Sequence, residues 1–352
     1  MREDAGPGRL RVGVVGAGWV ATKRHIPAFK RSGEATLDAV LDPNPARAEA
    51  VARRFRIPRS FSSLERFLEE PLDAIAVCTP PMTHGSLIEA ALRAGRHVLV
   101  EKPMTLTAGE GRALEALAES SGLVLCPAHN FLFSRSTARA RDVLRRGEVG
   151  EVCWAMGVQL SSWRRRLPTW FHQLPGGLFF DEAPHLLYLM RHFLGDLDVE
   201  GAWGTSTGEG PPSGMERLEA RLRGTHGEGY LTMWSGAPFS EWLFILFCSR
   251  GVLVLDLFRD LLIHLPPEKA HSSRDVIEMA LRSTYQKWWG MATSGLRFLG
   301  GRLYYGHDAL VKQFLQSVSG VGEPPATARD GWTVVGLMED ILKLSAGKSR
   351  QG

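Results

Sequence analysis

The sequence predicts an α/β domain with a parallel sheet, followed by an α+β domain with a large, mostly antiparallel open sheet. As far as Cys126, short apolar runs alternate with helical stretches, which is typical of a parallel sheet covered by helices on both faces. After His129 the strand-like runs follow one another through turns. We therefore expect a first domain at residues 1–128 and a second at 129–352, with late helices that can pack back on the first.

The elements of the first domain are predicted from apolar runs and from helix-end residues. Pro45 stands at an early helical position, where its missing N–H costs nothing, and Gly95 closes a helix. The predicted strands are Leu10–Val15, Ala35–Leu41, Ala74–Cys78, His97–Val100 and Leu123–Cys126. The predicted helices are Val20–Arg31, Pro45–Phe55, Ser86–Ala94 and Ala108–Ser120.

The second domain is predicted to be a sheet of turn-connected strands with a few helices. A tight hairpin is expected at Ser249–Gly251, a loop at 207–214 and a fraying tail at 348–352. The predicted strands are Glu151–Leu160, Asp198–Thr205, Arg217–Leu222, Gly229–Trp234, Trp242–Phe247 and Val252–Leu257. The predicted helices are Thr137–Arg146, Ala183–Leu194, His307–Val318 and Gly331–Ala346.

Composition restricts the classes of partner and compartment. The net charge of +4 comes from scattered arginines, whereas nucleic-acid binding needs positive charge on one face, so we expect no nucleic-acid partner. The longest apolar run, Trp242–Cys248, is far shorter than the ~20 residues of a membrane helix. The four cysteines are widely spaced, which predicts reduced thiols and no metal site. Without an apolar leader at the start, we expect a cytoplasmic protein that makes no membrane contact.

A phosphate-binding turn is predicted directly after the first strand. Gly16 allows the tight bend, Gly18 lets the backbone approach a pyrophosphate, and Ala21 is the third small residue of the pattern. Trp19 and Val20 open the following helix, whose free N–H groups favour phosphate oxygens. A plain tight turn would look similar, but the strand before it and the helix after it favour dinucleotide binding.

The acidic residue at the end of the second strand predicts the type of dinucleotide. Asp42 is placed to accept hydrogen bonds from adenosine ribose hydroxyls and to repel a 2′-phosphate, which favours NAD. An alternative is that Asp42 caps the next helix, ahead of Pro43. Arg47 could instead neutralise a 2′-phosphate, so NADP stays open as the cofactor.

Three residues are candidates for proton and charge chemistry. Lys102 follows the strand His97–Val100, at the carboxyl edge where open α/β sheets bind ligands. Asp181 and His185 are four residues apart in a helical stretch and share one face, so the carboxylate can orient the imidazole for proton transfer. The alternatives are an exposed strand-end lysine, a helix-capping aspartate and a buried core histidine. The combination predicts hydride transfer between a nicotinamide cofactor and a secondary hydroxyl or ketone of a sugar, polyol or sugar derivative.

Several motifs resemble the Gfo/Idh/MocA family of NAD(P)-dependent oxidoreductases over about residues 10–344. The motifs that carry the resemblance are Val12–Trp19, Thr79–His84, Ala94–Pro103, Gly147–Gly150, Gly176–His185 and Asp330–Gly331. The resemblance implies a Rossmann domain followed by an open-sheet domain that often forms oligomers, and so a homodimer or homotetramer. It also implies catalytic roles for Lys102, Asp181 and His185. The residues it implies around the nicotinamide and its ribose are Thr79, Pro80, His84, Glu101 and Lys102.

The chain departs from the family pattern near the expected substrate pocket. Ala183 stands where many members have glycine, Tyr188 where many have aspartate, and Leu132 where many have arginine. Two further functions therefore stay open. One is a glycoside hydrolase that uses NAD for transient oxidation, and the other is a catalytically inactive NAD-binding regulator.

Overall fold

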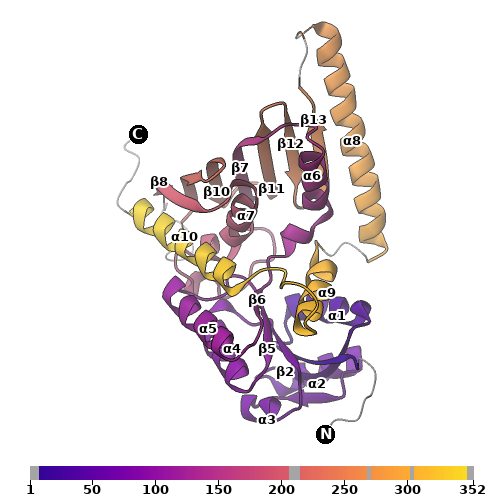
Figure 1. Cartoon of the computed structure of the whole chain (residues 1–352), viewed down its shortest axis with the longest axis vertical. Coiled ribbons are helices and arrows are strands. Elements are labelled where there is room, and N and C mark those ends of the chain that lie inside the picture. Colours follow the sequence, from indigo (N-terminus) through magenta and orange to yellow (C-terminus); the bar gives the residue numbers. More distant parts are fainter. Residues whose placement is uncertain (1–7, 206–214, 268–269, 271, 302–304, 347–352) are drawn as a thin grey trace. The chain divides into compact units, whose positions relative to one another are not determined.

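The computed structural model describes residues 8–205, 215–267, 270, 272–301 and 305–346 (Figure 1). The chain divides into two compact units. The first contains residues 1–129 and 307–335, and the second contains residues 130–306 and 336–352. The loop expected at 207–214 and the tail expected at 348–352 lie outside the described residues.

The first unit is built on a six-stranded parallel sheet with the order β3-β2-β1-β4-β5-β6. Its strands are β1 (Leu10–Val15), β2 (Ala35–Leu41), β3 (Arg59–Phe61), β4 (Ala74–Val77), β5 (His97–Val100) and β6 (Leu125–Pro127). Val14 in the centre pairs with Val40 on one side and Ala76 on the other, and all three are fully buried. Continuous apolar strands of this kind require helices on both faces of the sheet.

The helices of this unit cover both faces. Figure 1 shows α4 and α5 on one side of the strands and α1 and α9 on the other. The α-helices are α1 (Ile26–Ser32), α2 (Pro45–Phe55), α3 (Leu64–Leu68), α4 (His84–Arg93), α5 (Ala108–Ser120) and α9 (His307–Val318). Two short helical turns, η1 (Ala21–His25, a π-helix) and η2 (Pro81–Thr83, a 3₁₀ helix), precede α1 and α4.

The order of the strands brings three separate loops to one edge of the sheet. Because β1, β4 and β5 are neighbours and parallel, their carboxyl ends meet there. The backbone continues the pairing one residue past the strands, since Cys78 N donates to Val15 O and Glu101 N donates to Val77 O. The turn after β1, the segment after β4 and the segment after β5 therefore lie side by side, as ligand sites of open α/β sheets require.

The second unit is built on a seven-stranded sheet with the order β13-β12-β11-β7-β10-β9-β8. Its strands are β7 (Val152–Ser161), β8 (Leu197–Thr205), β9 (Arg217–Gly224), β10 (Gly227–Ser235), β11 (Glu241–Cys248), β12 (Gly251–Asp256) and β13 (Leu261–Leu265). All neighbours are antiparallel except β7 and β10. The expected mostly antiparallel sheet is confirmed, and so is the hairpin, in which Cys248 pairs with Gly251.

One face of this sheet is covered by α7 (Leu178–Leu194), which packs on β7 and β10. Gly157 in β7 permits the close approach, because a Cβ there would lie 3.2 Å from Leu186 Cβ. The other helical elements are η3 (Asn130–Phe133), α6 (Arg135–Arg145), η4 (Phe171–Gln173) and α8 (Ser273–Leu299). The last helix of the chain is α10 (Ala328–Ala346).

Candidate active site

The turn after β1 has the backbone geometry that a dinucleotide-binding loop needs. Gly16 has φ +93°, and a Cβ there would lie 2.7 Å from the carbonyl oxygen of Cys78, so only glycine fits. A Cβ at Gly18, in contrast, would meet no atom within 4 Å. That open side leaves room for a pyrophosphate against the backbone, so the turn fits the cofactor.

Asp42 is bound to this turn by its carboxylate. Asp42 is buried, its Oδ2 accepts a hydrogen bond from Ala17 N (3.0 Å), and its Oδ1 accepts one from Asn44 N (2.9 Å). Arg47 Nη1 lies 3.6 Å from Oδ2. The cap of α2 is Asn44, whose side chain accepts from Arg47 N, so the alternative in which Asp42 caps this helix is wrong.

The segment after β4 is held to the segment after β5 by His84. His84 is fully buried at the start of α4. Its Nδ1 lies 2.8 Å from Pro103 O, and its Nε2 lies 2.9 Å from Thr79 O. Burial lowers the pKa of His84 below its ordinary value, although both carbonyl oxygens favour a protonated ring. His84 therefore links the segment Thr79–Pro80 to the peptide that follows Lys102.

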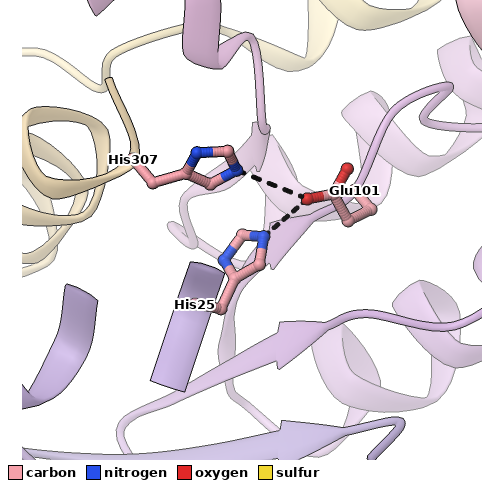
Figure 2. Close-up of side chains that lie close together, drawn as sticks. All are labelled: His25, Glu101 and His307. Carbon is pink, nitrogen blue, oxygen red and sulfur yellow. Dashed lines mark hydrogen bonds and ion pairs between the residues drawn. The ribbon is translucent and has the colours of Figure 1, made fainter. Parts of the chain in front are cut away.

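Glu101 is held by two histidines that sequence reasoning did not identify. Figure 2 shows His25 and His307 directing ring nitrogens toward the same carboxylate oxygen of Glu101. His25 Nε2 lies 2.6 Å from Glu101 Oε1, and His307 Nε2 lies 4.0 Å from it. The two rings form an edge-to-face pair with centroids 5.3 Å apart. All three side chains are buried.

The electrostatics of this cluster favour an ionised Glu101. Burial alone would raise the pKa of Glu101, but the hydrogen bond from His25 and the charges of His25, His307 and Lys102 outweigh burial. The pKa of Glu101 is therefore held well below its usual range. The other carboxylate oxygen accepts a hydrogen bond from Lys102 N (3.2 Å), so the cluster fixes the backbone from which the Lys102 side chain extends.

The same three residues form a group of potential metal ligands, with ligand atoms within 4.8 Å of one another. Two nitrogen or oxygen ligands of one tetrahedral ion, each about 2.0–2.1 Å from it, lie roughly 3.3 Å apart. The 2.6 Å separation between His25 and Glu101 is shorter and has the length of a charge-assisted hydrogen bond. We therefore interpret the cluster as an ion pair and keep the prediction of no metal.

In the second unit, Asp181 and His185 lie one turn apart on α7, as the spacing predicts. The helix begins at Leu178 after Gly177, so Asp181 lies in its first turn and does not cap it. His185 is buried against two aromatic rings, with centroids 4.9 Å from Phe131 and 5.3 Å from Trp242. The imidazole is therefore held rigidly by its surroundings.

Tyr188, one of the departures from the family pattern, hydrogen-bonds to His185. The Tyr188 hydroxyl oxygen lies 2.9 Å from His185 Nδ1 and accepts a hydrogen bond from Phe131 N (3.0 Å). This contact engages Nδ1 of the ring, and the tautomer of His185 determines which of the two atoms donates. Sequence reasoning noticed Tyr188 only as a departure, although it stands at i+3 from His185, which is helical-neighbour spacing.

A second cluster of charged and polar side chains surrounds Glu182, the residue next to Asp181. Glu182 forms an ion pair with Arg165 and accepts hydrogen bonds from Gln159 and from Ser161 (2.8 Å). Burial lowers the pKa of Arg165, while the charge of Asp181 opposes this effect. Arg165 therefore pairs with Glu182 and interacts electrostatically with the adjacent Asp181 of α7. The separation of Arg165 from α7 in the sequence did not reveal this arrangement.

The fold and the glycine turn define a dinucleotide-binding protein of the Rossmann class. Comparison with known proteins extends this assignment. Residues 10–129 match the model of an oxidoreductase family with an NAD-binding Rossmann fold, Gfo/Idh/MocA. A dTDP-3,4-didehydro-2,6-dideoxy-alpha-D-glucose 3-reductase of Saccharopolyspora spinosa is 34% identical over 70% of this chain and 74% of that protein. The chain therefore belongs to the Gfo/Idh/MocA family of NAD(P)-dependent oxidoreductases.

Other relatives match less of the chain or at lower identity. The enzyme of the same name from Streptomyces antibioticus is 36% identical over 55% of this chain and 60% of its own length. A 1,5-anhydro-D-fructose reductase of Ensifer adhaerens is 24% identical over 97% of this chain and 98% of its own length. Levoglucosan dehydrogenase in complex with NADH has the same fold, with a TM-score of 0.80 at 18% identity over 97% of this chain and 98% of that chain. Among the described residues, no helix is long and apolar enough to cross a membrane.

Proposed function

We propose that this protein transfers a hydride between a nicotinamide cofactor and a secondary hydroxyl or ketone carbon of a sugar, polyol or sugar derivative. The observation that carries the proposal is the edge of the parallel sheet. There the glycine turn after β1 has an open side at Gly18, and Lys102 follows β5, which is separated from β1 by β4 alone. The relatives support the substrate class, since they include a dTDP-sugar 3-reductase and an inositol 2-dehydrogenase of Rhizobium meliloti.

The residues proposed to hold the cofactor follow the edge of the sheet. Backbone N–H groups of Gly18, Trp19 and Val20 suit the pyrophosphate, because these residues open a helix. Gly16 shapes the turn beside the cofactor, and its own N–H donates to Leu41 O. Asp42 suits the adenosine ribose and favours NAD, while Arg47 beside it keeps NADP as the alternative. The residues proposed near the nicotinamide and its ribose are Thr79, Pro80, His84, Glu101 and Lys102.

The proposed chemistry uses the side chains of His185, Lys102 and Asp181. When bound, the nicotinamide ring supplies the hydride acceptor or donor. His185 removes the proton from the substrate hydroxyl in oxidation and returns it in reduction, which is worth about 10²–10⁴ in rate. Lys102 stabilises negative charge on the same oxygen. Asp181 supports the charged imidazole electrostatically, while Tyr188 and the aromatic rings hold it in place.

Glu101 is proposed to position Lys102. Its carboxylate is engaged by His25 on one oxygen and by the peptide N–H of Lys102 on the other. His25 comes from the π-helical turn that follows the glycine turn. Glu101 therefore links the cofactor-binding turn to the backbone of Lys102, and loss of its carboxylate should affect both.

A turnover screen tests the proposed function. Purified protein is incubated with NADH or NADPH and a dTDP-ketosugar or 1,5-anhydro-D-fructose, and with NAD or NADP and inositol or free sugars, while absorbance of the reduced cofactor is followed. Net change of the reduced cofactor with one substrate class supports the proposal. Release of an aglycone from a glycoside without net redox change would identify the hydrolase, and tight NADH binding without turnover would identify the inactive regulator.

Three further assignments are proposals of the same kind. The cytoplasm is the proposed compartment, in keeping with four free cysteines. A homodimer or homotetramer is the proposed assembly. Residues 1–128 are proposed as the cofactor-binding domain and residues 129–352 as the domain for substrate binding and oligomerisation.

A further inference from the structure

The longest helix of the protein, α8, exposes its apolar side chains. The helix has 27 residues and contacts strand β13. Ten large apolar side chains along it and at its end are between 46% and 82% exposed. They are Val276, Ile277, Leu281, Tyr285, Trp288, Trp289, Met291, Leu296, Phe298 and Leu299.

The side of α8 that faces the protein is small and polar instead. Its two buried residues are Gly290 and Ser294. A Cβ at Gly290 would lie 2.9 Å from Leu261 Cβ, so glycine lets the helix approach the sheet closely. Gln286 is also on this side and hydrogen-bonds to the backbone of His264, accepting from its N (2.8 Å) and donating to its O (3.0 Å). The amphipathic pattern of α8 is thus the reverse of that of an ordinary surface helix.

The exposed face is large enough for a stable protein interface. If a fully exposed large apolar side chain offers about 150–250 Å², the ten side chains together expose on the order of 1,000 Å². The largest apolar patch on a typical monomer is about 300–600 Å². A standard interface buries about 800 Å² on each partner. The face therefore has the area of one half of an interface.

We infer that the apolar face of α8 binds α8 of a second copy of this chain, in an antiparallel pair centred on Trp288. The face has one stripe whose members are four, four, three, four, three and four residues apart, close to the helical repeat. These are Ile277, Leu281, Tyr285, Trp288, Ala292, Gly295 and Leu299. In the antiparallel pair, Leu281 lies opposite Gly295 of the partner subunit, so a bulky residue meets a small one.

This inference deepens the proposed assembly and rests on it, and of the homodimer and the homotetramer it commits to the homodimer. The backbone of β13, an edge strand, is bonded to Gln286 at His264, so α8 blocks strand pairing between copies at this edge. Because strands cannot pair at this edge, two copies can meet there through their α8 helices instead. Such a two-fold, isologous pair is the commonest kind of assembly. A membrane surface is the competing partner. It is disfavoured because the polar side of such a helix lies in water, whereas the residues of α8 opposite its apolar face, Gln286 and Ser294, are turned toward the protein.

Substitution and cross-linking test the interface. Trp288→Glu and Leu281→Glu should convert the wild-type dimer to a monomer in light scattering after gel filtration, with NADH binding retained. Val321→Glu, an exposed apolar residue of the first unit, is the matched control and should stay dimeric. In a Cys153→Ser background, Trp288→Cys should form a disulfide-linked dimer on mild oxidation, whereas Phe239→Cys should not.

Each contrary result overturns the inference. A monomeric wild type, or a dimer that survives both acidic substitutions, would show that α8 does not pair. Sedimentation of the wild type with phosphatidylcholine–phosphatidylglycerol vesicles, lost in Trp288→Glu, would identify a membrane instead. Turnover is measured on the same proteins. A wrong inference about the interface can then be distinguished from a wrong proposal about the activity. The cysteine test needs no buried charge and holds even if the acidic variants misfold.

Discussion

His185 illustrates how the environment of a residue determines its chemistry. Its Nδ1 is hydrogen-bonded to Tyr188, and two aromatic rings restrict the imidazole. In oxidation an unprotonated Nε2 accepts the proton of the substrate hydroxyl, and the ring becomes an imidazolium. In reduction the imidazolium returns that proton to the ketone oxygen. The hydroxyl of Tyr188 therefore influences the protonation state that the reaction begins from.

We predict that His185→Gln lowers kcat by about 10²–10⁴, the usual contribution of a general acid or base. NADH affinity should be unchanged, because the proposed cofactor contacts all lie in the first unit. Tyr188→Phe should lose less activity, since the imidazole stays in place between its rings. Steady-state kinetics and NADH fluorescence measure both effects, with the exposed His172→Gln as the control. A wild-type kcat in His185→Gln would remove the proposed role.

Glu101→Gln should reduce stability at neutral pH by more than the exposed Glu119→Gln. The folded pKa of Glu101 is depressed, so folding stabilises its charged form above the ordinary value of 4.5. That contribution is lost as pH falls below 4.5 toward the folded pKa. The difference between wild type and variant in urea midpoints should therefore shrink on acidification. A difference that is constant with pH would contradict the ion pair.

The residues that sequence analysis missed are those whose partners are distant in the chain. Glu101 was predicted from its motif, but His25 and His307 stand 76 and 206 positions away from it and have no local pattern. Only the topology brings the start of α9 next to the turn before α1. The ion pair between Arg165 and Glu182 was missed for the same reason. A sequence pattern reports neighbours along one element and not contacts between elements.

At the scale of elements, the first unit was predictable because its strands and turns carry strong local signals. The bounds of β1, β2, β5, α2 and α5 agree with prediction, since apolar runs and end residues mark them directly. The helix α8 was not predicted. Its inward positions are small or polar and its outward positions are apolar. The apolar residues of α8 therefore do not mark the face that packs on its own chain, and a search for such a face does not find this helix.

The glycine turn permits a test that separates folding from binding. Gly16→Ala should cost about 1–3 kcal/mol of stability, because φ is +93° and the new Cβ meets Cys78 O. Gly18→Ala should leave stability near wild type, since its Cβ meets no atom, yet weaken NADH binding by tenfold or more by occupying the space for the pyrophosphate. Thermal melting and NADH titration distinguish them. Equal effects of both changes on binding and stability would contradict this division.

At the scale of the whole molecule, each of the two units carries the residues for different parts of the proposed function. The first unit collects the glycine turn, Asp42, Glu101 and Lys102 around one sheet edge, and it recruits α9 from late in the chain. The second unit carries His185 on α7 and the apolar face of α8. Acid–base chemistry and self-association are therefore assigned to one unit, and cofactor binding to the other.

If α8 pairs as inferred, the stability of the whole molecule depends on protein concentration. Association stabilises the folded state by mass action, so dilution lowers the thermal midpoint. With an unfolding enthalpy of about 0.7 kcal/mol per residue, a dimer of this size should gain about 1 °C for each tenfold increase in concentration. Calorimetric scans at one rate over a hundredfold range measure this shift. Trp288→Glu should melt at a midpoint independent of concentration, because its unfolding releases no partner. A wild type that behaves in the same way would show that folding of this chain is not coupled to self-association.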